Sequence, residues 1–193
     1  MAKFNIAENI TGRNEGGYAN NPADTGGETY AGISRNNWPA WKGWKYIDSY
    51  KASRPSASKL SITGWVNASA KVTTEPVSAL VSQFYKQNFW DSMSLDLLND
   101  QQLANSIYDF GVNSGTGRAA KFIQSAVNDL GVLALVVDGE IGSKSISAIN
   151  NSDPLRLYKA FNKRRKDFYL SIATGSQKQF LSSWLSRLKL YVA

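Results

Sequence analysis

The sequence contains no cysteine and no histidine among its 193 residues. Without cysteine there is no disulfide framework, no thiolate metal site and no cysteine nucleophile. Without histidine, the Ser-His-Asp and Cys-His mechanisms and histidine-bound zinc are excluded. Carboxylates therefore remain as the main candidates for acid–base chemistry, and we expect neither a bound metal nor a cofactor.

Long hydrophobic runs are missing as well. No stretch approaches the roughly 18 continuous apolar residues of a membrane span. Residues 1–9 lack the apolar segment of a secretory signal peptide. We expect synthesis in the cytoplasm, no stable membrane insertion and, for action outside, a holin-type or other release route.

The composition that is present is typical of a globular protein, with 42% apolar and 19% charged residues. The net charge of +7 favours a negatively charged partner, such as nucleic acid, an anionic membrane surface or an anionic cell-wall polymer. No nucleic-acid-binding motif is recognisable, so we do not expect nucleic acid. The basic run at 163–166 lies in a helical pattern and is expected to be solvated.

Apolar residues at helical spacing predict a mostly α fold. Residues 18–37 are rich in Asn, Gly and Thr, which predicts a loop with a small hairpin around 29–34. Residues 48–73 contain serine-rich stretches and Pro55, which predicts an irregular connection or a short helix. Helices are expected at 2–14, 74–90, 100–113, 116–130, 153–172 and 180–188, with Asp100 and Asp153 before two of them.

Two carboxylates stand beside glycine pairs near the start of the chain, in Glu15-Gly16-Gly17-Tyr18 and in Asp24-Thr25-Gly26-Gly27. Glycine lets a ligand approach the backbone closely, so the two pairs suggest a cleft. Glycoside hydrolysis needs two carboxylates, one to protonate the leaving oxygen and one to handle water. The alternative is a helix end followed by a solvated hairpin.

The two carboxylates have different surroundings. A general acid needs a raised pKa, which Ile10 and Tyr18 would provide for Glu15 as apolar walls. Asp24 lies among glycine and threonine and would stay ionised to orient water. Thr29 and Tyr30 are candidates to hold that water or a sugar hydroxyl.

An aromatic cluster follows at 38–46, with three tryptophans and a tyrosine in nine residues. It predicts either a sugar-stacking surface or a small satellite core under a loop. Farther along, Asn113 would either bind an N-acetyl group or cap its own helix. We expect Asp109 to be a structural hydrogen-bond partner and not a third acid.

Five ordered motifs together resemble the N-acetylmuramidases of glycoside hydrolase family 108, also called secretion activator proteins and found in prophages and bacterial release loci. The resemblance covers nearly the whole chain. The motifs are Glu15-Gly16-Gly17-Tyr18; Asp24, Gly26-Gly27, Thr29 and Gly32-Ile33-Ser34; Phe84-Tyr85 with Phe89-Trp90; 108–115; and Val137–Gly142, similar to the family's peptidoglycan-binding segment, with 184–187.

The resemblance implies a lysozyme-like helical domain with a short irregular or β-hairpin segment after the first helix. It implies cleavage of the β-1,4 bond between N-acetylmuramic acid and N-acetylglucosamine, with Glu15 as the acid. Glu15 and Asp24 keep the spacing of phage-type lysozymes, whereas Thr29 comes one residue early. Tyr18, Tyr30, Asn113 and Trp90 are the expected substrate-binding residues.

We expect a catalytic part at 1–90 and a helical part at 91–193, which contains the peptidoglycan-binding-like segment, packed as one compact unit. The protein is expected to be a monomer, and its expected partner is the glycan strands of peptidoglycan. Two alternatives stay open. One is a peptidoglycan-binding or secretion accessory module without catalysis. The other is a lytic transglycosylase, which needs a single Glu and forms an anhydro ring.

Overall fold

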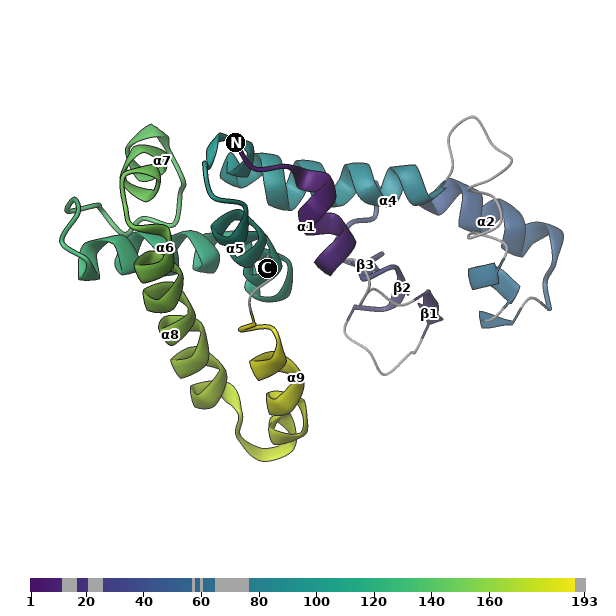
Figure 1. Cartoon of the computed structure of the whole chain (residues 1–193). Coiled ribbons are helices and arrows are strands. Elements are labelled where there is room, and N and C mark those ends of the chain that lie inside the picture. Colours follow the sequence, from purple (N-terminus) through teal and green to yellow (C-terminus); the bar gives the residue numbers. More distant parts are fainter. Residues whose placement is uncertain (12–16, 21–25, 57, 60, 65–76, 190–193) are drawn as a thin grey trace. The chain divides into compact units, whose positions relative to one another are not determined.

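The computed structural model describes residues 1–11, 17–20, 26–56, 58–59, 61–64 and 77–189 (Figure 1). The chain divides into two compact units, one of residues 11–86 and one of residues 1–10 with 87–193. The division at 86/87 lies four residues before the expected boundary, and the first ten residues belong to the C-terminal unit. The packing of the two parts as one compact body stays a prediction.

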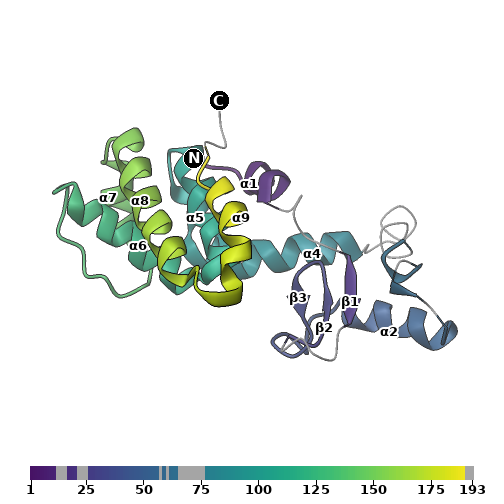
Figure 2. The same cartoon turned by 90° about the horizontal axis from the view of Figure 1, so that it is seen from below.

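The unit of residues 11–86 contains a three-stranded antiparallel sheet in the order β1-β2-β3 (Figure 2). The strands are β1 Tyr18–Asn20, β2 Glu28–Tyr30 and β3 Ile33–Ser34. Ala31 and Gly32 join β2 to β3 with φ of 46° and 75°, as a type I′ turn requires. The hairpin expected at 29–34 is therefore present.

Helices accompany this sheet within the same unit, and two of them carry most of its buried apolar residues. Helix α2, Trp44–Ser53, buries Trp44, Ile47 and Tyr50 at three-residue spacing, so one face is apolar. It begins inside the aromatic cluster, four residues before the connection expected at 48–73. Helix α4, Val77–Tyr85, buries Val77, Leu80, Phe84 and Tyr85.

The other unit is helical in all its described regular elements. Its N-caps agree with expectation, since Asp100 accepts from Leu103 N at 2.8 Å and Asp153 from Arg156 N at 2.7 Å. None of the described helices is long and apolar enough to cross a membrane. Two elements cross a unit boundary by one residue: α1 extends past residue 10, and the π-helix η2 begins before residue 87. The elements are α1 Phe4–Thr11, η2 Lys86–Trp90, η3 Asp91–Met93, η4 Leu95–Leu97, α5 Gln101–Ser114, α6 Thr116–Asp129, α7 Ser143–Asn150, α8 Pro154–Ile172, η5 Gly175–Phe180 and α9 Leu181–Ser186.

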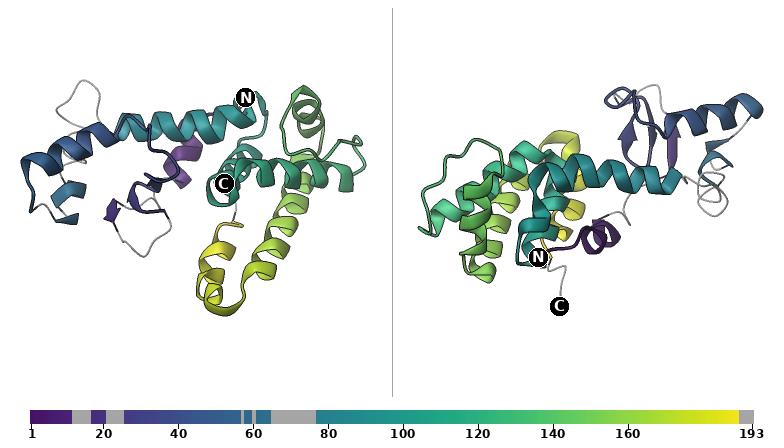
Figure 3. Two further views of the ribbon diagram at one scale, coloured as in Figure 1. Left: turned by 180° about the vertical axis from the view of Figure 1, so that it is seen from behind. Right: turned by 90° about the horizontal axis from the view of Figure 1, so that it is seen from above.

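Phe110 lies at the centre of this unit's core and is fully buried. Helix α5, which carries it, packs against α6 and α8, and α8 packs beside α9 (Figures 1 and 3). The surrounding rings lie mostly edge-on, the geometry that aromatic pairs prefer. They belong to Phe122, Phe161, Phe168 and Tyr169, with centroids 5.2–6.0 Å from that of Phe110.

The basic run at 163–166 corrects one expectation. Lys163 and Lys166 are exposed as predicted, but the side chain of Arg165 is completely buried. Arg165 stands four residues after Phe161 and four before Tyr169, so it falls on the inward face of α8. Its charge is matched by Asp109, whose carboxylate lies 2.6 Å away.

Candidate active site

The two predicted catalytic carboxylates, Glu15 and Asp24, lie outside the described residues. The structure does describe the residues that follow each of them, beginning at Gly17 and at Gly26. Hydrogen bonds to other parts of the same unit hold both of these segments.

The chain just after Glu15 is fixed by backbone contacts. Ala31 N donates to Gly17 O at 3.3 Å, and Tyr18 N donates to Thr63 Oγ1 at 2.9 Å. A Cβ at Gly17 would overlap the Thr63 side chain. The second glycine of the motif is thus required for the close approach of these two segments.

Glu28 is the centre of a polar network in this unit, which we call the Glu28 network. Its Oε1 accepts from Tyr18 OH at 2.6 Å and from Lys51 Nζ at 2.7 Å. Its Oε2 lies 2.6 Å from Arg35 Nε. Arg35 also grips Asp48 with both terminal nitrogens, at 3.0 and 2.6 Å. The Tyr18 side chain is therefore held on the sheet by a carboxylate with two cationic partners.

The Glu28 network decides the protonation state of its carboxylate. Burial alone would raise the pKa of Glu28, but hydrogen bonds from Lys51 and Tyr18 and the charge of Arg35 outweigh it and lower the pKa. Burial and the bond to Glu28 raise the pKa of the Tyr18 hydroxyl. Glu28 is therefore ionised near neutral pH, which suits an anchor and does not suit a general acid.

Sequence reasoning missed Glu28. The only local signal is strand alternation, because Asn20 pairs with Glu28 and Tyr18 with Tyr30. This register puts Glu28 on the same face as the two tyrosines. Its cationic partners, Arg35 and Lys51, lie too far along the chain for a spacing rule to identify.

Thr29 and Tyr30 are adjacent in β2, and alternation sends their side chains to opposite faces of the sheet. Tyr30 is buried and stacks on Trp41, with ring centroids 6.3 Å apart and an angle of 11°. Burial raises its pKa to about 12. Thr29 is half-buried opposite Ala19 and Ser34. The roles of Thr29 and Tyr30 toward substrate stay predictions.

Trp90 and Asn113, the other two predicted substrate contacts, lie in the C-terminal unit. Trp90 is only 1% exposed and packs edge-on against Phe4 and Tyr108, with centroids 5.7 and 5.9 Å away. These contacts describe a core residue. Asn113 is exposed, and its Nδ2 donates to Asp109 O at 2.6 Å, as a helix-end contact would. Substrate binding by either residue stays a prediction.

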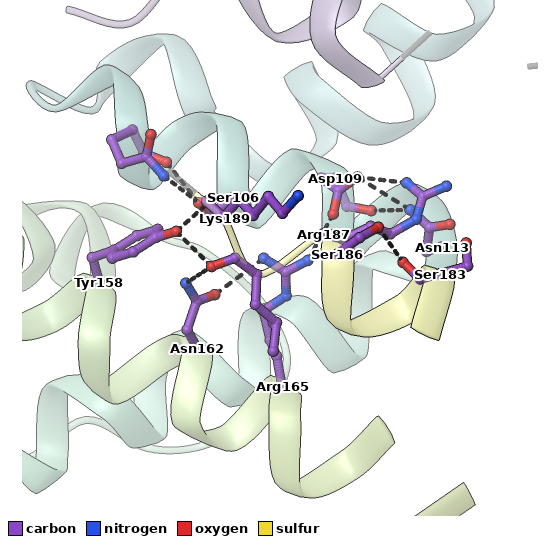
Figure 4. A network of polar contacts seen from close by, with 12 residues as sticks. Ser106, Asp109, Asn113, Tyr158, Asn162, Arg165, Ser183, Ser186, Arg187 and Lys189 are labelled. Carbon is purple, nitrogen blue, oxygen red and sulfur yellow. Dashed lines mark hydrogen bonds and ion pairs between the residues drawn. The ribbon is translucent and has the colours of Figure 1, made fainter. Parts of the chain in front are cut away.

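Asp109 has the structural role expected of it. Its Oδ2 accepts from Arg165 Nη2 at 2.6 Å and its Oδ1 from Arg187 Nη1 at 2.7 Å (Figure 4). The carboxylate side chain is 2% exposed and each of its oxygens is bound by an arginine, so it is held as an ion-pair partner and is not available to protonate a substrate. Within the described ranges, no three acidic side chains converge as metal ligands would.

The tryptophan cluster contains both buried and exposed rings. Trp44 is buried beneath the Arg35 guanidinium, 4.3 Å away, and its ring nitrogen donates to Trp38 O at 2.8 Å. Trp41 donates to Leu80 O at 3.3 Å. Both therefore form a satellite core, whereas the Trp38 ring is exposed.

Two family models match successive parts of the chain: residues 9–115 match Glycosyl hydrolase 108, and residues 118–189 match a predicted peptidoglycan domain. A solved structure of Brucella abortus SagA is 27% identical, with a TM-score of 0.64 over 96% of this chain and 88% of that chain. No match was found among curated proteins. The mostly α, lysozyme-like fold is confirmed, and because the first match spans more than half of the sequence, the chain belongs to the glycosyl hydrolase 108 family.

Proposed function

We propose that the protein is an N-acetylmuramidase that cleaves the β-1,4 bond between N-acetylmuramic acid and N-acetylglucosamine in peptidoglycan. The family match supports glycoside hydrolysis, and the peptidoglycan domain in the same chain supports the substrate class. The observation that carries the proposal is the anchoring of Gly17 and Tyr18, two and three residues after Glu15. An anchored motif beside an ionised Glu28, which is unsuited to be the acid, supports Glu15 in that role.

In this proposal Glu15 protonates the leaving oxygen and Asp24 positions the attacking water, with Thr29 beside it. The sequence between Glu15 and Asp24 is rich in turn-forming residues and contains Pro22, so we propose that the two carboxylates act from opposite sides of the scissile bond. That geometry suits single displacement with inversion, for which carboxyl groups stand roughly 6.5–9.5 Å apart. The first product is then the α-anomer.

The decisive experiment compares the wild-type protein with Glu15→Gln on purified peptidoglycan. Glutamine keeps the volume but has no labile proton to donate, so the loss of turbidity should slow by about 10²- to 10⁴-fold. Asp96→Asn, at an exposed carboxylate of the other unit, is the control and should retain activity. A Glu15→Gln variant with wild-type rate would remove Glu15 from the mechanism.

Product analysis separates the alternatives. Hydrated muropeptides by mass spectrometry support a hydrolase, whereas anhydro-muropeptides identify a lytic transglycosylase. Binding to sacculi without any soluble product identifies an accessory module. A first product in the β-configuration by NMR, or a covalent adduct on Asp24, contradicts inversion, and Asp24→Asn should slow the reaction without trapping such an adduct.

The substrate also sets the proposed place of action, which is the cell wall. The protein would reach it after release from the cytoplasm by a holin-type or other route, as an endolysin or secretion activator of prophage type would. Microscopy of cells that express the protein with and without a co-expressed holin tests this, because lysis should require the holin.

A further inference from the structure

Trp38 is the outlier of the tryptophan cluster. Its side chain is 39% exposed, whereas Trp44 is 3% exposed. Its ring packs on Phe84 in an edge-on contact, with centroids 4.9 Å apart and planes at 86°. Part of the side chain is open to solvent, and residues 36, 37, 39 and 40 around it are exposed as well.

The backbone that carries Trp38 is held rigidly. Its carbonyl oxygen accepts from Trp41 N at 3.1 Å and from the Trp44 ring nitrogen at 2.8 Å. Its own N–H donates to Ser34 O at 2.9 Å. The loop therefore fixes an exposed aromatic ring, which is the arrangement expected of a preorganised binding residue and not of a residue on a mobile loop.

The loop that carries Trp38 rests on the same small core as the Glu28 network. Arg35, which binds Glu28, lies over the Trp44 ring, and the Trp44 ring nitrogen donates to the Trp38 carbonyl oxygen. A Cβ at Gly43 would overlap the Trp41 ring, so the loop also depends on a glycine at its end. Specific contacts of Trp44, Trp41 and Gly43 therefore support the loop that exposes the Trp38 ring.

We propose that Trp38 is a glycan-binding platform that stacks on a pyranose ring of the substrate strand. This rests on the proposed function, which supplies a polysaccharide substrate. The axial C–H face of a pyranose is apolar, while its hydroxyls stay solvated at the edge. A half-exposed indole fixed at one edge offers the complementary flat apolar surface without burying any polar group of the sugar.

The test uses N-acetylglucosamine hexamer, an uncharged probe, so that the net charge of the protein does not contribute. Affinity is measured by calorimetry in the Glu15→Gln background, where the probe is not cleaved. Trp38→Ala and Trp38→Leu should each weaken binding about tenfold, because neither offers a flat ring. Trp38→Tyr should stay within about threefold of the Glu15→Gln parent, and Lys42→Ala, exposed in the same loop, should not change affinity.

Leucine and tyrosine separate stacking from simple packing on Phe84. If Trp38→Leu binds like the Trp38 parent, or if the parent does not bind the hexamer, the proposal is wrong. A melting curve of each variant identifies a folding defect, and equal weakening by tyrosine and leucine would also overturn the stacking model. Cleavage of peptidoglycan with unaltered hexamer affinity in Trp38→Ala leaves the muramidase proposal intact and removes the platform alone. If hexamer binding depends on Trp38 but the wild-type protein does not cleave peptidoglycan, the glycan-binding role of Trp38 stands and the muramidase proposal is wrong.

Discussion

Arg165 Nη2 lies 2.6 Å from Asp109 Oδ2, and both side chains are almost completely shielded from water. The preceding residue, Arg164, pairs with Asp129 at the surface through two hydrogen bonds of 2.9 and 2.7 Å. Two adjacent arginines of α8 therefore each pair with an aspartate, one in the core and one at the surface. Figure 4 shows that the buried pair also joins Arg187 from the end of α9.

This contrast predicts very different effects of two adjacent substitutions. Arg165→Met removes one partner of a buried pair and should lower the free energy of unfolding by roughly 3–5 kcal/mol. Arg164→Met removes an exposed pair and should cost about 0–1 kcal/mol. Urea unfolding monitored by circular dichroism measures both. Equal losses would show that burial does not set the strength of the Arg165 contact.

Gly17→Ala tests the approach of the Glu15 motif to Thr63. The added methyl group overlaps the Thr63 side chain, so we expect a loss of about 1–3 kcal/mol in unfolding free energy together with lower lytic activity. Gly64→Ala is the matched control, since a Cβ there meets no atom within 4 Å. A Gly17→Ala variant as stable as Gly64→Ala would mean that the contact relaxes freely.

Ala31 is a non-glycine residue with positive φ at the first position of the I′ turn. The left-handed conformation costs an alanine roughly 1–2 kcal/mol, and glycine regains part of this while losing backbone entropy. Ala31→Gly should therefore increase the free energy of unfolding by about 0.5–1 kcal/mol and raise the melting temperature accordingly. Ala19→Gly, in the exposed position of β1, should lower stability by about as much. Destabilisation by both would argue against strain at Ala31.

The alkaline limit of stability should depend on Tyr30. Burial raises its pKa from 10.0 to about 12, so the folded state holds the phenol proton more tightly than the unfolded state. The resulting stabilisation is complete below pH 10 and is lost as pH rises through 12, a change of about 2–3 kcal/mol. Tyr30→Phe should flatten the unfolding free energy in this window relative to wild type. Tyr46→Phe serves as the control, and parallel curves for wild type and Tyr30→Phe would contradict the prediction.

The sequence predicted the features that depend on near neighbours along the chain. The periodic stripes of α5, α6 and α8 and the caps at Asp100 and Asp153 follow from contacts within about four residues. The burial of Arg165 could not be predicted, because its partner Asp109 is 56 residues away. Before that partner is known, a basic run in a helix is most simply interpreted as solvated.

The candidate site shows the same limit. Glycine pairs and carboxylates marked the stretch around Glu15, since small residues and acids signal a cleft locally. The anchor of Tyr18 on Glu28, and of Glu28 on Lys51, depends on strand register and on a helix 23 residues farther along. The exposure of Trp38 among three neighbouring tryptophans was likewise decided by tertiary packing, which spacing does not encode.

The Asp109 contacts also bear on how this protein can be cut and recombined. The segment that matches the hydrolase model ends at residue 115, and the segment that matches the peptidoglycan model begins at 118. Helix α5 lies before this junction, yet its Phe110 and Asp109 are enclosed by α6, α8 and Arg187 from after it. The junction between the two matched segments therefore divides a single hydrophobic core, to which residues on both sides contribute. Exchange of cell-wall modules between relatives would have to carry α5 along, with a crossover before residue 101.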